Sequence, residues 1–107
     1  MSSTLPDITA APNATFAATV TVLDDFGLHA RPAASLAKTA QSFECSITLS
    51  LGEQCADAKS ILDILSLAAA RNSTLTISCN GIDAKNAGEA LIKLFEARFH
   101  LEAEPGL

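Results

Sequence analysis

One stretch of the sequence alternates apolar and polar residues without a break. From Phe43 to Leu51 every odd-numbered residue is apolar and every even-numbered residue is polar or charged. Because successive side chains of a strand point to opposite faces, this pattern predicts a β-strand with one face in the core and the other in water. Gly52 and Glu53 mark a turn, so Gln54 to Asp57 are expected to pair back as a short hairpin strand.

Two further segments alternate in the same way, and each predicts a half-buried strand. The first begins at Thr15 and is broken by Asp24 and Gly27, and the second runs from Thr74 to Asn80. The expected inward positions are Ala18, Val20 and Val22 in the first segment, and Leu75, Ile77 and Cys79 in the second.

Three segments have helical spacing instead. Residues 30–41 are rich in alanine, and Pro32 fits this helix only within its first turn, so the helix is expected to begin at His29 or Ala30. A short apolar helix is predicted for Ser60 to Leu67, and an amphipathic helix ends the chain. The apolar positions of the two longer helices are Ala33, Leu36, Ala37 and Ala40 in the first, and Ala87, Leu91, Leu94 and Phe95 in the last.

The predicted order is strand, helix, strand, strand, short helix, strand, helix. Strands with one apolar face suggest a mostly antiparallel sheet covered by helices on one side, and the class is α+β. The chain of 107 residues suffices for one small domain, which we assign to residues 15–100. Residues 1–14 have no periodicity and are expected to form a mobile extension, and residues 101–107, with His100 before them, a solvated tail.

Charge and hydropathy exclude several classes of protein. A net charge of −5 argues against binding to nucleic acid or to an anionic membrane surface, since both need a basic patch. No apolar run approaches the roughly 20 residues of a membrane span. The N-terminus has neither the basic nor the apolar region of a signal peptide.

The cysteines point to a reducing compartment. Their number is three, which is odd, and they form no CxxC motif and have no histidine at zinc spacing. We therefore expect a cytoplasmic protein with free thiols, without metal or cofactor. Cys45 and Cys79 fall on inward positions and are expected in the core, whereas Cys55 lies on the hairpin strand, where a thiol can be exposed.

The chemistry is concentrated at His29, in the stretch "GLHARPA". At the start of a helix its ring lies beside backbone N–H groups that have no intrahelical partner, which is an anion site. Arg31 can add a forked set of donors for a phosphate. The positive helix end also disfavours protonation of the ring, leaving a neutral nucleophile able to accept a phosphoryl group. The plainer interpretation is that His29 is only a helix cap.

A second motif begins at Ser60, in "KSILDILSL". Ser60 precedes an apolar run and Asp63 follows three residues later, which is the pattern of a capping box. Ile61, Leu62, Ile64 and Leu65 offer more apolar surface than so short a helix can bury. Arg71 and Asn72 are expected to form a turn.

Together, "GLHARPA" and "KSILDILSL" resemble HPr, the family of histidine-containing phosphocarrier proteins of the bacterial sugar phosphotransferase system. The resemblance covers about residues 15 to 99. It implies an open-faced β-sandwich of order βαββαβα, with four antiparallel strands and three helices. It also implies that His29 takes a phosphoryl group on Nδ1 from enzyme I and hands it to a IIA domain, while Arg31 steadies the group. Such a protein is a carrier and not an enzyme.

The same resemblance implies a regulatory and a docking role around Ser60. In many bacteria the matching serine is phosphorylated by an HPr kinase/phosphorylase. The apolar residues Ile61, Leu62 and Leu65 would form a docking patch beside His29, with Lys38 and Lys59 steering the partners. Two departures stand out: Asp63 occupies a position where relatives usually have glycine or a basic residue, and the whole chain is acidic.

Two alternatives remain open. The protein could be a mainly regulatory binding module acting through Ser60, in catabolite control or in a nitrogen-related branch of the relay. A hydrolase using His29 as its nucleophile lacks a general base or metal constellation. We expect a monomer, because nothing in the sequence indicates a dimer seam.

Overall fold

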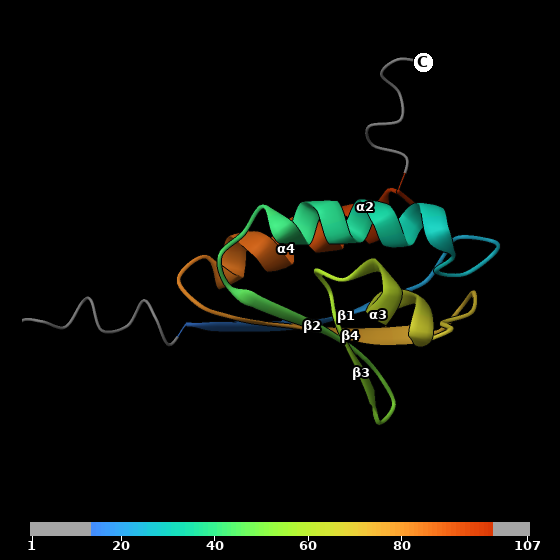
Figure 1. Ribbon diagram of the computed structural model, residues 1–107, viewed down its shortest axis with the longest axis horizontal. Coiled ribbons are helices and arrows are strands. Elements are labelled where there is room, and N and C mark those ends of the chain that lie inside the picture. The colour runs from blue at the N-terminus through green and yellow to red at the C-terminus, as the bar shows by residue number, and fades with distance from the viewer. Residues whose placement is uncertain (1–13, 100–107) are drawn as a thin grey trace, which may run out of the picture.

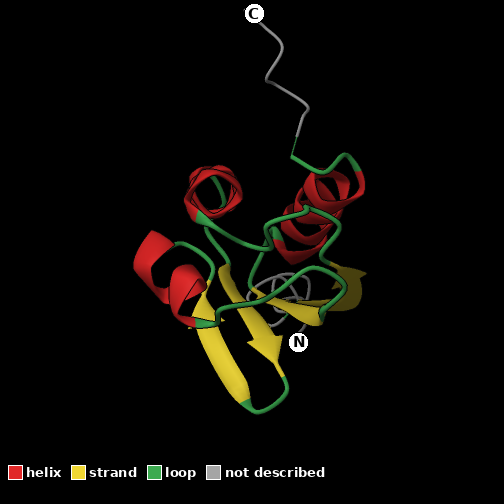
Figure 2. Cartoon of the chain, turned by 90° about the vertical axis from the view of Figure 1, so that its right-hand side faces the viewer, coloured by secondary structure: helices red, strands yellow, loops and turns green. Residues whose placement is uncertain are grey.

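The computed structural model describes residues 14–99, which form one four-stranded antiparallel sheet with helices on one face (Figures 1 and 2). The proposed extension up to residue 13, His100 and the tail 101–107 lie outside the described residues. The elements, in chain order, are β1 (Thr15–Thr21), α2 (Ala30–Gln41), β2 (Ser46–Leu51), β3 (Gln54–Asp57), α3 (Ile61–Ser66), β4 (Thr74–Asn80) and α4 (Ala84–Glu96). The predicted order and class are confirmed.

The strands lie in the order β1-β4-β2-β3, and all neighbouring pairs are antiparallel. Their register places inward residues opposite one another: Val20 faces Leu75, Ile77 faces both Ala18 and Leu49, and Cys79 faces Ile47 and Phe16. Of these residues, Val20, Ile47, Leu49, Leu75, Ile77 and Cys79 are buried. The alternation in the sequence therefore identified the buried face of β2 and β4 correctly, because a strand has a side-chain period of two.

Strand β2 begins at Ser46, three residues later than the alternation predicted. The amide of Phe43 donates to the carbonyl of Ala40 in the turn that ends α2. The next two amides, of Glu44 and Cys45, donate to the two carboxylate oxygens of Asp83 at 2.9 Å each. Because these N–H groups are satisfied by a side chain, the sheet ladder starts only after them. The alternation still places Cys45 inside, at 3% exposed.

Helices α2 and α4 lie side by side over the sheet, and α3 covers the part nearest β3 (Figures 1 and 2). Helix α2 begins at Ala30, so Pro32 stands in its first turn as predicted. The core is mainly aliphatic, and its largest fully buried side chain is Phe95. Within residues 14–99, the structure contains no helix with the length and apolar character needed to span a membrane.

The predicted core cysteines are buried, and all three thiols are free. Burial, followed by the hydrogen bond with Asp83, raises the pKa of Cys45 to about 12, and burial also raises the pKa of Cys79. Both are therefore protonated and unreactive near neutral pH. Cys55 is exposed on β3.

The two hydrogen bonds that the Asp83 carboxylate accepts from the amides of Glu44 and Cys45 make the stability of the folded protein depend on pH. The Glu44 amide, with help from that of Cys45, holds the pKa of Asp83 below its ordinary value of 3.8. A carboxylate whose pKa is lowered by folding stabilises the protein above the unfolded pKa, and this contribution is lost as the pH falls through the folded value. We expect Asp83→Asn to lower the melting temperature at pH 7, and the difference from wild type to shrink below about pH 4.

Thermal melts between pH 2 and pH 7 check this expectation. Glu89→Gln is the matched control, because it removes one negative charge from an exposed position on the same helix. A melting-temperature difference that is equal at pH 7 and at pH 2.5 would show that the Asp83 carboxylate does not act through its charge.

Candidate functional site

His29 is the N-cap residue of α2, as predicted, but its ring does not cap the helix. Among the described residues the side chain makes no capping hydrogen bond, and the backbone carbonyl of His29 accepts from the amide of Ala33 at 3.0 Å. The side chain is 40% exposed. The imidazole is thus placed at the positive end of a helix and remains available for chemistry.

The loop before α2 fixes this position. The amide of Gly27 donates to the carbonyl of Asp24 at 3.0 Å, closing a turn, and Gly27 has φ +72°. The next amide, of Leu28, donates to the carbonyl of Ala69 at 2.9 Å, and the Leu28 side chain is buried. A Cβ atom on Gly27 would lie 2.4 Å from the Ala69 oxygen. The loop can therefore approach this backbone only with glycine at position 27.

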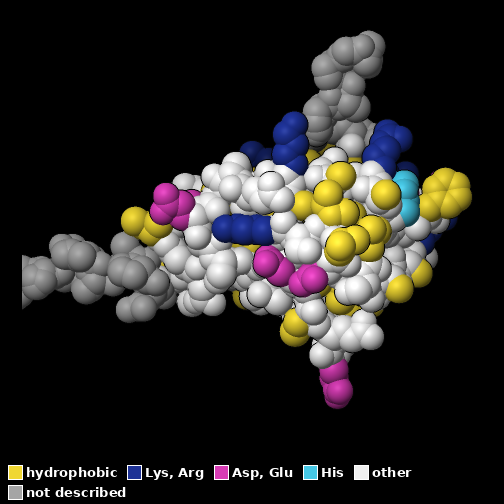
Figure 3. Space-filling view, viewed as in Figure 1, with side chains coloured by type: hydrophobic (Ala, Val, Ile, Leu, Met, Phe, Trp, Pro, Cys, Tyr) yellow, Lys and Arg dark blue, Asp and Glu magenta, His cyan; other side chains and the backbone are white. Residues whose placement is uncertain are grey.

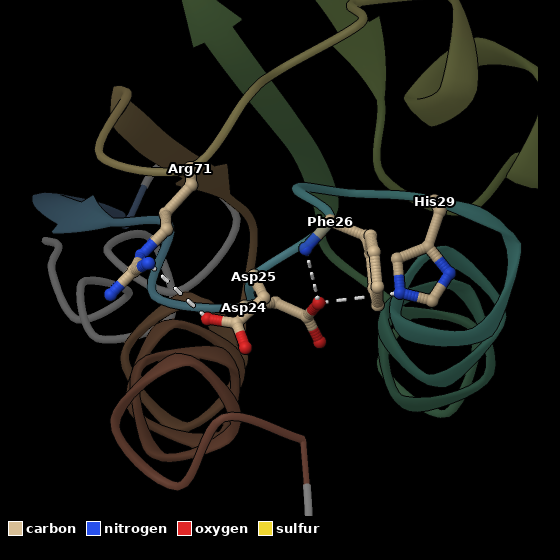
Figure 4. A network of polar contacts seen from close by, with 5 residues as sticks. All are labelled: Asp24, Asp25, Phe26, His29 and Arg71. Atoms are coloured by element: carbon tan, nitrogen blue, oxygen red, sulfur yellow. Dashed lines mark hydrogen bonds and ion pairs between the residues drawn. The ribbon is translucent and has the colours of Figure 1, made fainter.

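Two side chains of the same loop contact the ring (Figure 4). Nε2 of His29 lies 3.3 Å from Oδ1 of Asp24, whose side chain is 19% exposed. The ring of Phe26 meets the imidazole edge-on, with centroids 5.8 Å apart, although Phe26 itself is 83% exposed. Asp25 points away from the imidazole and pairs instead with Arg71 at 3.4 Å.

A cavity of about 260 Å³ opens beside His29. Two arginines, Arg31 and Arg98, line it together with His29. The complete lining is Leu23, Asp24, Asp25, Phe26, His29, Arg31, Pro32, Arg98 and Phe99. A site with two arginines beside an exposed imidazole is suited to a small anion such as a phosphoryl group.

Sequence reasoning missed Arg98. This residue follows α4 in a left-handed conformation, φ +54°, and the next residue, Phe99, has φ +64°. Phe99 is buried, its amide donates to the carbonyl of Leu94 at 2.8 Å, and its ring packs edge-on against Phe95. This turn brings Arg98 to the cavity at the start of α2, a placement with no local signal in the sequence.

Ser60 is the N-cap of α3, as predicted, but only half of the capping box forms. Its hydroxyl oxygen accepts from the amide of Asp63 at 3.2 Å. The Asp63 carboxylate does not reach back to the Ser60 amide; it accepts from the amide of Asp57 at 3.2 Å. The Ser60 amide donates to the Asp57 carbonyl at 3.0 Å. The carboxylate of Asp63 thus ties β3 to the start of α3.

The apolar residues after Ser60 divide between core and surface. Ile64 is fully buried, and Leu65 is partly buried against the core. Ile61 and Leu62 are 40% and 77% exposed. Figure 3 shows a group of hydrophobic side chains on the same face as the histidine.

The two lysines that were predicted to steer partners, Lys38 and Lys59, do not line the cavity beside His29 as Arg31 does. Lys38 is exposed in the last turn of α2, about 13 Å from His29 along the helix axis at 1.5 Å per residue. The ammonium group of Lys59 donates to the carbonyl of Phe43 at 2.8 Å.

Residues 14–99 contain no group of three or more His, Cys, Asp or Glu side chains placed to hold a metal ion.

Comparison with known proteins decides the family. Residues 16–97 match the family described as PTS HPr component phosphorylation site. The chain belongs to the HPr family. Among HPr relatives, the phosphocarrier protein HPr of Xylella fastidiosa (strain Temecula1) is 38% identical over 81 residues, which are 76% of this chain and 91% of the relative. The phosphocarrier protein NPr of Shewanella violacea is 40% identical over 80 residues, 75% of this chain and 88% of the relative.

Solved HPr structures share the fold. The crystal structure of HPr-C-His from Thermoanaerobacter tengcongensis aligns with a TM-score of 0.76 and 34% identity, covering 78% of this chain and 94% of the other. The open-faced sandwich of order βαββαβα that the resemblance implied is therefore confirmed, and the protein is an HPr-type phosphocarrier of the phosphotransferase system.

The contact of Gly27 with the Ala69 backbone predicts an unequal response of two glycines. Gly27→Ala and Gly52→Ala both place a side chain at positive φ, but a Cβ on Gly52 meets nothing within 4 Å. We expect Gly52→Ala to cost about 1 kcal/mol in the free energy of unfolding, from backbone strain alone. Gly27→Ala should cost about 3 kcal/mol or more, because the backbone at Ala69 must also move.

Denaturant unfolding of the two variants measures this difference. Equal losses of stability in the two variants would contradict the close approach of Gly27 to the Ala69 carbonyl.

Proposed function

We propose that His29 accepts a phosphoryl group on Nδ1 from phosphorylated enzyme I and passes it to a IIA domain. The observation that supports this best is the placement of an exposed, uncapped imidazole in one cavity with Arg31 and Arg98. The nitrogen attacks phosphorus as a nucleophile, and the arginines stabilise the charge on the phosphoryl oxygens.

The start of α2 supports the same chemistry. The amides of Ala30 and Arg31 come before the first intrahelical hydrogen bond, so they are free to face an anion. Pro32 has no amide to satisfy, and the exposed residue after Ala33, Ala34, has a small side chain that leaves room for a bulky donor. A phosphoryl group on His29 would therefore meet backbone N–H groups and guanidinium groups at the same place.

For partner docking we propose the surface formed by Ile61, Leu62 and Leu65. Ile61 and Leu62 are exposed although they are large and apolar, which is typical of protein contact surfaces. Lys38 stays a proposed steering charge for these partners. Lys59 stays one as well, although its ammonium group is already bonded to a backbone carbonyl.

Ser60 is the proposed site of regulation, by an HPr kinase/phosphorylase where one is present. A phosphate on this hydroxyl would add about −1.5 to −2 charges next to the exposed Ile61 and Leu62 and would repel acidic partners. It would also displace the bond from the Asp63 amide. A mainly regulatory role through Ser60 alone would not explain why His29, Arg31 and Arg98 line one cavity.

We further propose that the protein works as a monomer in the cytoplasm. The free and buried thiols of Cys45 and Cys79 fit a reducing compartment. The exposed apolar surface is then explained by partner docking.

The carrier function predicts a specific loss in His29 variants. We expect wild type incubated with phosphoenolpyruvate and enzyme I to gain the mass of one phosphoryl group that is labile in acid and stable in alkali. His29→Ala should gain none. Arg31→Ala should be phosphorylated about tenfold more slowly, and Arg31→Lys should fall between, because it keeps the charge but loses the forked geometry.

Intact-mass spectrometry of quenched time points measures these rates. Ser60→Ala is the control for the second phosphorylation site and should match wild type. Phosphorylation of His29→Ala at the wild-type rate would overturn the proposal, and so would the absence of phosphorylation when a known HPr is phosphorylated in the same mixture.

A further inference from the structure

We propose that Asp24 is a positioning residue for His29: its carboxylate holds the proton on Nε2, which leaves Nδ1 free to take the phosphoryl group. This inference rests on the proposed phosphocarrier function and deepens it. It follows from the contact of 3.3 Å between Asp24 Oδ1 and His29 Nε2.

The carboxylate of Asp24 is fixed in place by its own loop. Oδ1 accepts a hydrogen bond from the amide of Phe26 at 3.1 Å, and the Asp24 carbonyl accepts from the amide of Gly27 at 3.0 Å. The side chain is largely buried, at 19% exposed. Figure 4 shows the same oxygen joined to both Phe26 and His29. Because the loop sets this carboxylate, the imidazole meets a preorganised partner.

The charge of the Asp24 carboxylate then determines which nitrogen of the His29 ring bears hydrogen and which holds the lone pair. An ionised carboxylate has only acceptor sites, so the ring nitrogen that faces it is the one that bears hydrogen. In the neutral ring the other nitrogen must hold the lone pair. Figure 4 shows this second nitrogen, Nδ1, directed away from Asp24. Asp24 therefore selects the tautomer in which Nδ1 is the nucleophile.

The carboxylate also offsets the charge that transfer creates. The lone pair of Nδ1 forms the new N–P bond while the bond from phosphorus to the nitrogen of a phosphohistidine donor breaks, and that electron pair stays on the donor ring. The His29 ring now has phosphorus on Nδ1 and the proton on Nε2, and it is positively charged. The Asp24 carboxylate faces this charge, as the aspartate of a catalytic triad faces an imidazolium.

Its neighbour Asp25 provides a matched control. Asp25 has the same charge and is one residue away, but it pairs with Arg71 at 3.4 Å and is 70% exposed. Removal of either carboxylate changes the net charge of the protein by one unit. Only the removal of Asp24 takes a partner from the ring.

The test uses the full chain labelled with ¹⁵N-histidine, at about pH 9, where imidazoles are neutral. Signals of the second histidine, His100, are identified with His100→Gln. The ¹⁵N chemical shifts of the His29 ring report which nitrogen bears hydrogen. We expect wild type and Asp25→Ala to be protonated mainly at Nε2, and Asp24→Ala to shift toward the Nδ1–H form. Asp24→Asn keeps an acceptor oxygen and should retain the wild-type tautomer.

The rate of phosphorylation by enzyme I provides the second readout. Loss of a partner that orients a functional imidazole typically costs 10–100-fold, and for a half-exposed ring we expect about tenfold in Asp24→Ala. Asp24→Asn should be slowed less, since it loses only the charge, and Glu89→Ala, which removes an exposed carboxylate outside the cavity, should match wild type. Melting curves of all variants are compared first, and Asp24→Asn serves for the rate comparison if Asp24→Ala does not fold.

A wild-type ring protonated mainly at Nδ1, or an unchanged tautomer in Asp24→Ala, would overturn the inference. The tautomer is measured on the unphosphorylated protein, so its result is independent of the carrier function. Failure of wild type to be phosphorylated would instead overturn the proposed function.

Discussion

The site depends on a single close contact between two backbone segments. The amide of Leu28 donates to the carbonyl of Ala69, and Gly27 approaches the same carbonyl so closely that no side chain fits between them. This contact joins the loop before α2 to the segment between α3 and β4. It fixes where the loop ends and the helix begins, and His29 occupies that boundary. Without it, the imidazole would have no defined place relative to Arg31 or Asp24.

Around the ring, opposite charges act from different sides. The positive end of α2 and the two arginines that line the cavity favour an anion there, whereas the Asp24 carboxylate brings a negative charge to the ring at Nε2. A carrier must hold a phosphoryl group and then release it, so neither field should dominate. The sequence motif "GLHARPA" includes the start of the helix and Arg31 but not the Asp24 carboxylate.

Much of the fold was predictable because it follows from local periodicity. Alternation identified the buried faces of β2 and β4, and the place of Pro32 identified the start of α2. The prediction was wrong at residues 43–45, where the Asp83 carboxylate, nearly forty residues away, takes the amides that would have extended β2. A long-range side-chain contact of this kind has no periodic signal.

The candidate site was likewise predictable where its residues lie in a local sequence motif. His29 and Arg31 lie in one motif, and Ser60 begins the other, so both were found from the sequence. Arg98 reaches the cavity through a left-handed turn after α4 and was missed. The contact between Asp24 and Nε2 of His29 was also missed, although the two residues are only five positions apart. This contact depends on how the turn at Gly27 directs the two side chains.

The carrier account can be tested by finding which atom bears the phosphoryl group. Protein labelled with ¹⁵N-histidine would be phosphorylated by enzyme I and phosphoenolpyruvate and observed by ³¹P and ¹⁵N NMR. The account predicts one phosphorus signal with a through-bond coupling to Nδ1 of His29, and a proton on Nε2. A coupling to Nε2, to a nitrogen of His100, or a signal from a serine phosphate alone would contradict it.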